Sequence, residues 1–220
     1  MACLLFCFSD EPIEGDERYD RPNMFNIGMI DAPTREPLCC LYGCIFPCCA
    51  FYQLREKALD GDLSNYRCCQ GYYDRGPCKS GSCGEEQCPA LCLCIEAWWC
   101  SSCSISATRM FVMDNYFLQS DPMDRRLIRF NNALQCLSCI CHVLAAFDRN
   151  LRDLAQCIDC IAHIVYYSTA GCMNAQVNHE LEFRKAPSLM KPNEQEGHVL
   201  GGGGGDYQPP QADKIDRADV

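Results

Sequence analysis

One short motif occurs twice in this sequence: Cys136-Leu137-Ser138-Cys139-Ile140-Cys141-His142 and, 21 residues later, Cys157-Ile158-Asp159-Cys160-Ile161-Ala162-His163. Both copies follow the pattern C-x-x-C-I-x-H. In a helix, residues three apart are neighbours on one face, and the sixth residue continues along that face with some drift. Each copy therefore predicts a short ladder of two thiols and one imidazole along a helix.

The two copies stand on either side of a predicted turn. Apolar patterning predicts helices over residues 123–147 and 150–177, joined by a tight turn near residue 149. If these helices form an antiparallel hairpin, the two ladders lie opposite each other. Three pairs are then expected at equal height: Cys139 with Cys160, His142 with Cys157, and Cys136 with His163.

These six side chains are of the types that zinc and similar divalent metals accept as ligands. They suffice for one four-coordinate site, or for two incomplete sites that share ligands with a neighbouring helix. The alternative is a cysteine-lined helix interface without metal, because a buried free cysteine behaves as a small apolar residue. With Cys100-Ser101-Ser102-Cys103 as the neighbouring motif, the predicted metal ligands are Cys100, Cys103, Cys136, Cys139, His142, Cys157, Cys160 and His163.

The rest of the chain predicts a mainly α fold. Residues 38–54 carry no charge, and Pro89 suits the first turn of a helix that runs to about residue 118. We expect a small bundle of three to four cysteine-rich helices with a Gly/Cys-rich loop and disordered acidic termini. The loop carries Cys68, Cys69, Cys78, Cys83 and Cys88, which predict a second metal cluster or a reversible disulfide. The expected parts are an acidic arm over 1–37, a cysteine-rich helical domain over 38–178 and a flexible tail over 179–220.

The composition limits the classes of function. A formal net charge of -10 argues against nucleic-acid binding, which requires a basic surface. The 22 cysteines would suit a secreted disulfide scaffold, but they lie in helix-like apolar stretches, and the apolar run at residues 2–8 is short for a signal peptide. We therefore expect an intracellular protein whose thiols are free, lipidated or metal-bound.

Enzyme classes find little support in the sequence. A thioredoxin-like C-x-x-C would be accompanied by alternating strands and helices, and no such alternation is predicted. The glycines at 201–205 are not followed by the lysine and helix of a phosphate-binding loop. We expect a protein without catalytic activity.

Membrane association is suggested by the apolar segments, although each of them is interrupted. A spanning helix needs about 20 predominantly apolar residues, and Glu96 and Asp159 each interrupt one candidate. One interpretation is a soluble bundle with both acids on its wet face. The other is partial insertion, helped by S-acylation of Cys3 and Cys7, in which the two acids mark an ion path or a partner.

The segment Cys40-Leu41-Tyr42-Gly43-Cys44-Ile45-Phe46-Pro47-Cys48 resembles the signature C-[CL]-x4-C-P-C of the placenta-specific-eight family. This family of cysteine-rich proteins includes cornifelin, plant cadmium resistance proteins and plant cell number regulators. Cys40, Leu41, Pro47 and Cys48 match the signature, whereas Phe46 stands in place of a cysteine. The similarity covers about residues 38–178. It implies a helical, membrane-associated and often oligomeric protein, connected in some relatives with divalent-cation transport or tolerance and in others with growth control.

Together, these features predict a protein associated with the plasma membrane or an endomembrane, with termini that face the cytosol. We expect it to act in divalent metal-ion homeostasis or transport through thiolate and imidazole ligands, with zinc or a similar metal, and to form homo-oligomers. Two alternatives stay open. One is a lipid-anchored, non-enzymatic scaffold or growth-regulatory adaptor, and the other is a soluble structural zinc protein.

Overall fold

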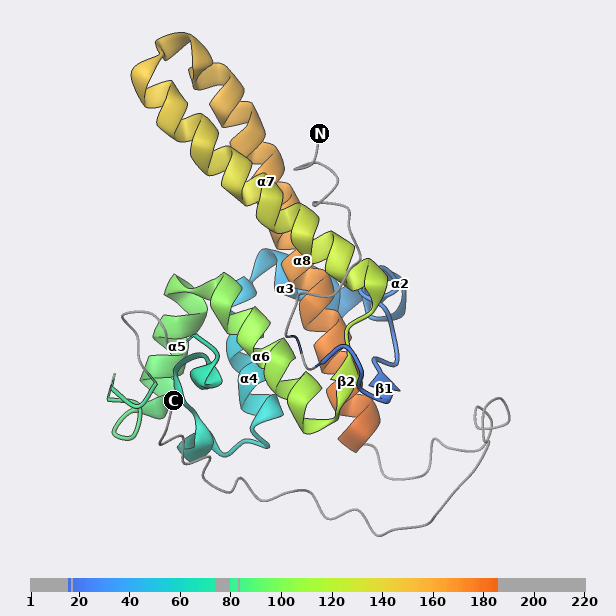
Figure 1. Ribbon diagram of the computed structural model, residues 1–220. Coiled ribbons are helices and arrows are strands. Elements are labelled where there is room, and N and C mark those ends of the chain that lie inside the picture. The colour runs from blue at the N-terminus through green and yellow to red at the C-terminus, as the bar shows by residue number, and fades with distance from the viewer. Residues whose placement is uncertain (1–15, 17, 74–79, 83, 186–220) are drawn as a thin grey trace. The chain divides into compact units, whose positions relative to one another are not determined.

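A computed structural model describes residues 16, 18–73, 80–82 and 84–185 (Figure 1). Within these residues the protein is mainly helical, which confirms the predicted fold class. Several predicted features lie outside the described residues: the acylation sites Cys3 and Cys7, the loop residues Cys78 and Cys83, and the tail beyond residue 185.

Helices account for nearly all of the regular structure. They are α2 (Ala32–Arg35), α3 (Pro37–Ile45), α4 (Pro47–Ala58), α5 (Pro89–Trp99), α6 (Ser101–Asn115), α7 (Pro122–Phe147) and α8 (Arg152–Lys185). Three short turns of helix connect them: η1 (Leu63–Asn65), η2 (Cys68–Gly71) and η3 (Arg149–Leu151). Two short strands, β1 (Asn23–Met24) and β2 (Leu118–Gln119), pair in parallel with Asn23 opposite Leu118.

Prolines set several of the helix starts. Helices α3, α4, α5 and α7 each begin at a proline, whose fixed φ suits the first helical position. Pro47 thus divides the uncharged segment 38–54 into α3 and α4. The helix predicted over 89–118 is also divided, because α5 and α6 meet at Cys100 with a bend of 116°.

The second half of α8 forms the centre of the core. Met173, Val177 and Leu181 are at most 5% exposed, and they belong to the same buried cluster as Phe51 of α4 and Val112 of α6. Helices α3, α4 and α6 all contact α8. Since α8 remains helical to residue 185, the compact domain extends past the boundary predicted at residue 178.

Residues 18–36 belong to this compact domain, so this described part of the acidic arm predicted over 1–37 is packed against the helices. Met29 is fully buried, and its N–H donates to the Asp124 carboxylate (3.0 Å). The carbonyl oxygen of Ile27 accepts from Gln176 (3.0 Å). The prolines and acids of this segment predicted an arm, but Ile27 and Met29 between them supply core contacts.

Helix α7 and the first half of α8 form the predicted antiparallel hairpin, which extends beyond the other helices (Figure 1). Small residues fill its seam: Ser138 and Ala145 from α7, and Ala155 and Ala162 from α8, are at most 8% exposed. Small side chains let two helices approach closely. The outward positions carry large apolar side chains that are 45% to 88% exposed: Leu137, Ile140, Val143, Leu144, Phe147, Leu154, Ile161 and Ile164.

Candidate functional site

The hairpin pairs its two helices close to the predicted register. Ser138 Oγ donates to Asp159 Oδ1 (2.7 Å), and Gln135 Nε2 donates to the carbonyl oxygen of Ala162 (2.7 Å). In an antiparallel pair the two residue numbers have a constant sum, which defines the register. This sum is 297 for both observed pairs and 299 for the predicted pairs, so the two registers differ by two residues. The two copies of the motif therefore lie side by side, as predicted.

The cysteines of the motif, however, face outward. The seam is filled by small residues such as Ser138 and Ala162, which leaves the thiols on the outer faces of both helices. All eight predicted metal ligands lie among the described residues, and no three of them bring ligand atoms within 4.8 Å of one another. The predicted convergence of the two ladders is therefore wrong. Of the six cysteines among the predicted ligands, Cys103 is partly buried, and the other five are exposed: Cys100, Cys136, Cys139, Cys157 and Cys160.

The hairpin does bring Asp159 together with the two histidines of the motif. His163 Nδ1 lies 3.4 Å from Asp159 Oδ2, and His142 Nε2 lies 3.9 Å from the same oxygen. In a tetrahedral zinc site, bonds of about 2.0–2.1 Å place neighbouring ligand atoms about 3.3 Å apart. The three side chains do not bring ligand atoms within 4.8 Å of one another, and His163 Nδ1 lies 2.9 Å from the carbonyl oxygen of Asp159, so both rings would have to turn for one metal ion to bind all three. The imidazoles are 51% and 57% exposed, so they remain accessible.

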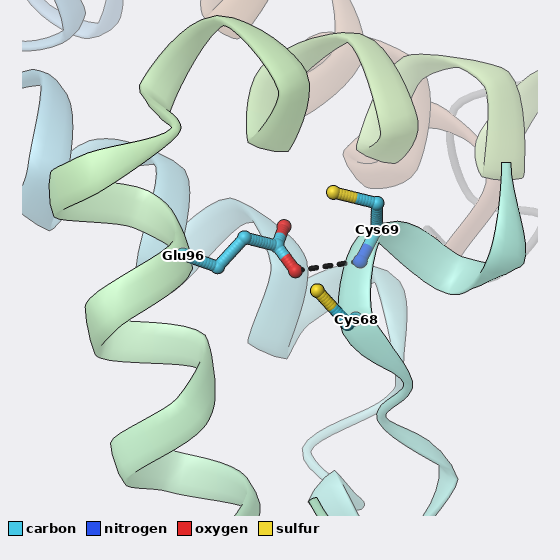
Figure 2. A group of neighbouring side chains, drawn as sticks. All are labelled: Cys68, Cys69 and Glu96. Atoms are coloured by element: carbon cyan, nitrogen blue, oxygen red, sulfur yellow. Dashed lines mark hydrogen bonds between the residues drawn. The ribbon is translucent and has the colours of Figure 1, made fainter. Parts of the chain in front are cut away.

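A second cluster joins the cysteine-rich loop to α5. Figure 2 shows Cys68, Cys69 and Glu96, whose two sulfurs and one carboxylate oxygen lie within 4.8 Å of one another. Glu96 is 5% exposed, so the prediction that it lies on a wet face is wrong. Cys69 and the following Gln70 both have positive φ, 47° and 49°. Such strain persists only where surrounding contacts hold the backbone in place.

The hydrogen bonds of Glu96 oppose a metal ion in this cluster. Oε1 accepts from Arg55 Nη2 (3.2 Å), and Oε2 accepts from the Tyr66 hydroxyl (2.8 Å) and from the Cys69 N–H (2.7 Å). The buried guanidinium of Arg55 also repels a cation at this position. Burial, and secondarily the charge of Glu96, raises the pKa of the Cys69 thiol, which disfavours the thiolate that a metal requires. The cluster therefore fits a structural role and not a zinc site.

Two exposed tryptophans lie near the point where the hairpin leaves the domain. Trp98 and Trp99, beside the α5–α6 bend, are 66% and 76% exposed. Ser101 Oγ, just after that bend, lies 2.8 Å from the Tyr166 hydroxyl of α8, which fixes the height of the bend along the hairpin. Among the described residues, α7 is the single unbroken helix long and apolar enough to cross a membrane, and only 6% of its apolar window is buried. A core helix of a soluble protein would be mostly covered.

The residues that match the family signature lie where α3 meets α4. Cys40 is buried, with its sulfur 3.8 Å from that of Cys172 on α8, and burial raises its pKa to about 11. Leu41 is exposed, Pro47 begins α4, and Cys48 is half-buried. Comparisons with protein-family models, with curated proteins and with solved structures found no match.

Proposed function

We propose that this protein is a membrane-inserted, non-enzymatic protein of divalent metal-ion homeostasis, whose α7–α8 hairpin enters the bilayer and binds metal at Asp159. The observation that carries the proposal is the distribution of side chains in the hairpin. Its outward positions are apolar and exposed, whereas Ser138 and Asp159 bond each other across the seam. This arrangement suits a pair of helices surrounded by lipid, where polar groups must find partners within the protein.

The dimensions of the hairpin agree with insertion. Residues 131–147 of α7 are uncharged, and at 1.5 Å per residue they extend over about 25 Å. The hydrocarbon layer of a bilayer is about 30 Å thick. At the base of the hairpin, Trp98, Trp99 and Tyr166 have the amphipathic rings that favour a membrane interface. At its tip, Asp148 and Arg149 are exposed charges.

Introducing charge on the outward face should release the protein from membranes. Ile140 and Ile164 are 50% and 62% exposed, so their replacement leaves the core intact. Each arginine at the centre of a membrane helix costs about 2.5–3.5 kcal/mol. We expect the double variant Ile140→Arg and Ile164→Arg to lower the fraction that resists alkaline carbonate extraction at least about tenfold.

A matched control places the same charges elsewhere. Met24 and Ile30 are 52% and 50% exposed but lie in the amino-terminal segment. Met24→Arg with Ile30→Arg should leave the carbonate-resistant fraction unchanged. Equal retention of both double variants would contradict insertion of the hairpin. If that retention disappeared after Cys3→Ser with Cys7→Ser, the lipid-anchored scaffold would replace the present proposal.

The chemistry at Asp159 favours a cation. A carboxylate in an apolar hairpin is costly unless it is paired, and such residues mark ion sites in membrane segments. Asp159 Oδ1 accepts a hydrogen bond from Ser138, and one nitrogen of His163 and one of His142 lie 3.4 Å and 3.9 Å from Oδ2. One carboxylate and two imidazoles supply oxygen and nitrogen ligands of the kind that zinc accepts. The ion bound here would be the cargo of the protein, and zinc is the first ion to test.

Removing the carboxylate should abolish tight metal binding. In detergent-purified protein under reducing conditions, we expect Asp159→Asn to weaken zinc binding at least about tenfold, because the ligand charge is lost. Isothermal titration calorimetry measures the affinity, and the spectrum of bound cobalt reports the ligand types. Asp153→Asn, at an exposed position of the same helix, is the control for charge alone and should bind as the natural sequence does.

A second variant separates this site from the thiol ladder. Cys139→Ser with Cys160→Ser should leave the zinc affinity unchanged, because both thiols face outward. Loss of binding in this variant, together with a thiolate-to-cobalt absorption band in the unmodified protein, would assign the metal to the cysteines and overturn the Asp159 site. Membrane insertion without any metal binding would favour the scaffold.

A further inference from the structure

A group of four thiols lies in the contact between α3 and α8 (Figure 1). Cys40 is buried, and Cys39, Cys44 and Cys172 are half-buried beside it. The sulfurs of Cys40 and Cys172 lie 3.8 Å apart, although the two residues are 132 positions apart in the sequence. The fold thus brings two thiols from distant segments into direct contact.

Two glycines bring the backbones of α3 and α8 together at the same place. A Cβ added at Gly43 would lie 3.0 Å from the Cα atom of Gly171, and a Cβ added at Gly171 would lie 2.6 Å from the carbonyl oxygen of Cys40. A disulfide requires Cα atoms about 4.4–6.8 Å apart, and two helices approach that closely only where small residues meet. Cys172 directly follows Gly171 in the sequence. The backbones that carry the two thiols therefore approach as closely as a disulfide requires.

The surroundings of this pair favour an uncharged product. Burial raises the pKa of Cys40 to about 11. Burial also raises the pKa of Cys172, and a hydrogen bond from Cys40 partly offsets that rise. A metal ion would require both sulfurs as thiolates, which burial opposes. A disulfide carries no charge, so the buried position suits an oxidised pair better than a metal site.

We propose that Cys40 and Cys172 form a reversible disulfide between α3 and α8, with a small-molecule disulfide such as oxidised glutathione as the oxidant. In the first step the thiolate of Cys172, which is half-buried and receives the hydrogen bond from Cys40, attacks one sulfur of the oxidant and releases one glutathione thiolate. The thiolate of Cys40 then attacks the Cys172 sulfur, which forms the new S–S bond and releases the second glutathione thiolate. The two thiol protons pass to the two glutathione molecules, so the protein loses two electrons and the oxidant gains them.

The disulfide has a clear structural consequence. It joins residues 132 positions apart, and disulfides that close long loops restrict the unfolded chain most. It also fixes α3 against α8 in the part of α8 that lies within the domain. The oxidised protein is therefore the more stable form. This site depends neither on membrane insertion nor on the metal site at Asp159, so its test is independent of both.

The test equilibrates the full chain, in a neutral detergent, with mixtures of reduced and oxidised glutathione. After an acid quench and alkylation with N-ethylmaleimide, mass spectrometry detects the cross-link between the tryptic peptides 36–55 and 153–184, and fragment ions assign the cysteines. We expect the cross-link between Cys40 and Cys172 to form as the proportion of oxidised glutathione rises. The thermal unfolding midpoint should rise with it by at least about 5 °C, and dithiothreitol should reverse both changes.

Cys40→Ala should abolish the cross-link and the rise of the midpoint. Cys39→Ala is the matched control, because Cys39 belongs to the same group of thiols but its sulfur accepts from Asn174 Nδ2 (3.3 Å). It should keep both effects, and the midpoints of the two reduced variants show that each is folded. Equal loss in both variants, or a cross-link that persists in Cys40→Ala, would overturn the assignment. So would a folded natural sequence without this cross-link in excess oxidised glutathione.

Discussion

Replacing Glu96 with glutamine should lower the free energy of unfolding by about 3–5 kcal/mol, the usual cost of removing one partner from a buried ion pair. The carboxylate holds Arg55, the Tyr66 hydroxyl and the Cys69 N–H at the same time. Glutamine has nearly the same shape, but it leaves the Arg55 charge buried without its counter-charge. Urea unfolding in detergent measures the change.

Glu86→Gln provides the control for this substitution. Glu86 pairs with Arg67 at a distance of 3.0 Å, but the two side chains are 76% and 44% exposed. Exposed pairs contribute about 0–1 kcal/mol, so the control should unfold almost as the natural sequence does. The double variant Arg55→Met with Glu96→Leu should recover only part of the loss, because it removes the unpaired charge of Arg55 but leaves the Tyr66 hydroxyl and the Cys69 N–H without their acceptor. Equal stability of Glu96→Gln and Glu86→Gln would contradict the role assigned to Glu96.

Replacing Gly171 with alanine should lower the free energy of unfolding by about 1–3 kcal/mol, although alanine is the better helix former by about 1 kcal/mol. A Cβ at this position would lie 2.6 Å from the carbonyl oxygen of Cys40 and would overlap the sulfur of Cys44. The carbonyl belongs to the backbone of α3, so the helices must move apart to accommodate it. The thermal unfolding midpoint should fall by about 2–4 °C for each kcal/mol lost.

Gly28→Ala is the corresponding control. Its Cβ would lie 3.5 Å from Asp31 Oδ2, an ordinary contact. The control should therefore leave the unfolding midpoint within about 2 °C of the natural sequence. A midpoint for Gly171→Ala that equals that of Gly28→Ala would show that α3 and α8 do not pack as closely as described.

The helices and the hairpin could be predicted from the sequence because their signals are local. Pro89 marks the start of α5, and the repeated motif around residue 149 gives the antiparallel pairing of α7 and α8 within two residues of the observed register. The break at Cys100 had no such signal, since the residues around it are compatible with a continuous helix. Local patterns define where a helix starts more reliably than where a neighbour bends it.

The candidate site was harder to predict, because it depends on which face of each helix turns inward. The residue types predict the thiols of the motif as ligands, but Ser138 and Ala162 are small and occupy the seam between the helices. Close packing of the two helices therefore places the small residues in the seam and the cysteines on the outer faces. Asp159 had a usable signal in its spacing of four residues from His163, which places the two side chains on one helix face.

The environment of Glu96 was also hard to predict, because its partner is distant in the sequence. A carboxylate within an apolar helix requires a partner when it is buried, and this requirement was visible in the sequence. Its partner Arg55 lies 41 residues away in the sequence, on α4. No local pattern connects these two residues, so the buried network could be recognised only from the packed structure.

Because α8 is one unbroken helix of 34 residues, it acts as a lever about 51 Å long at 1.5 Å per residue. One arm lies in the hairpin, and the other carries Gln176 and Glu180 deep in the domain. The close crossing with α3 at Gly171 acts as its fulcrum. A tilt of the hairpin would therefore shift the amino-terminal segment, which Gln176 and Glu180 hold through hydrogen bonds to Ile27 and Asn26.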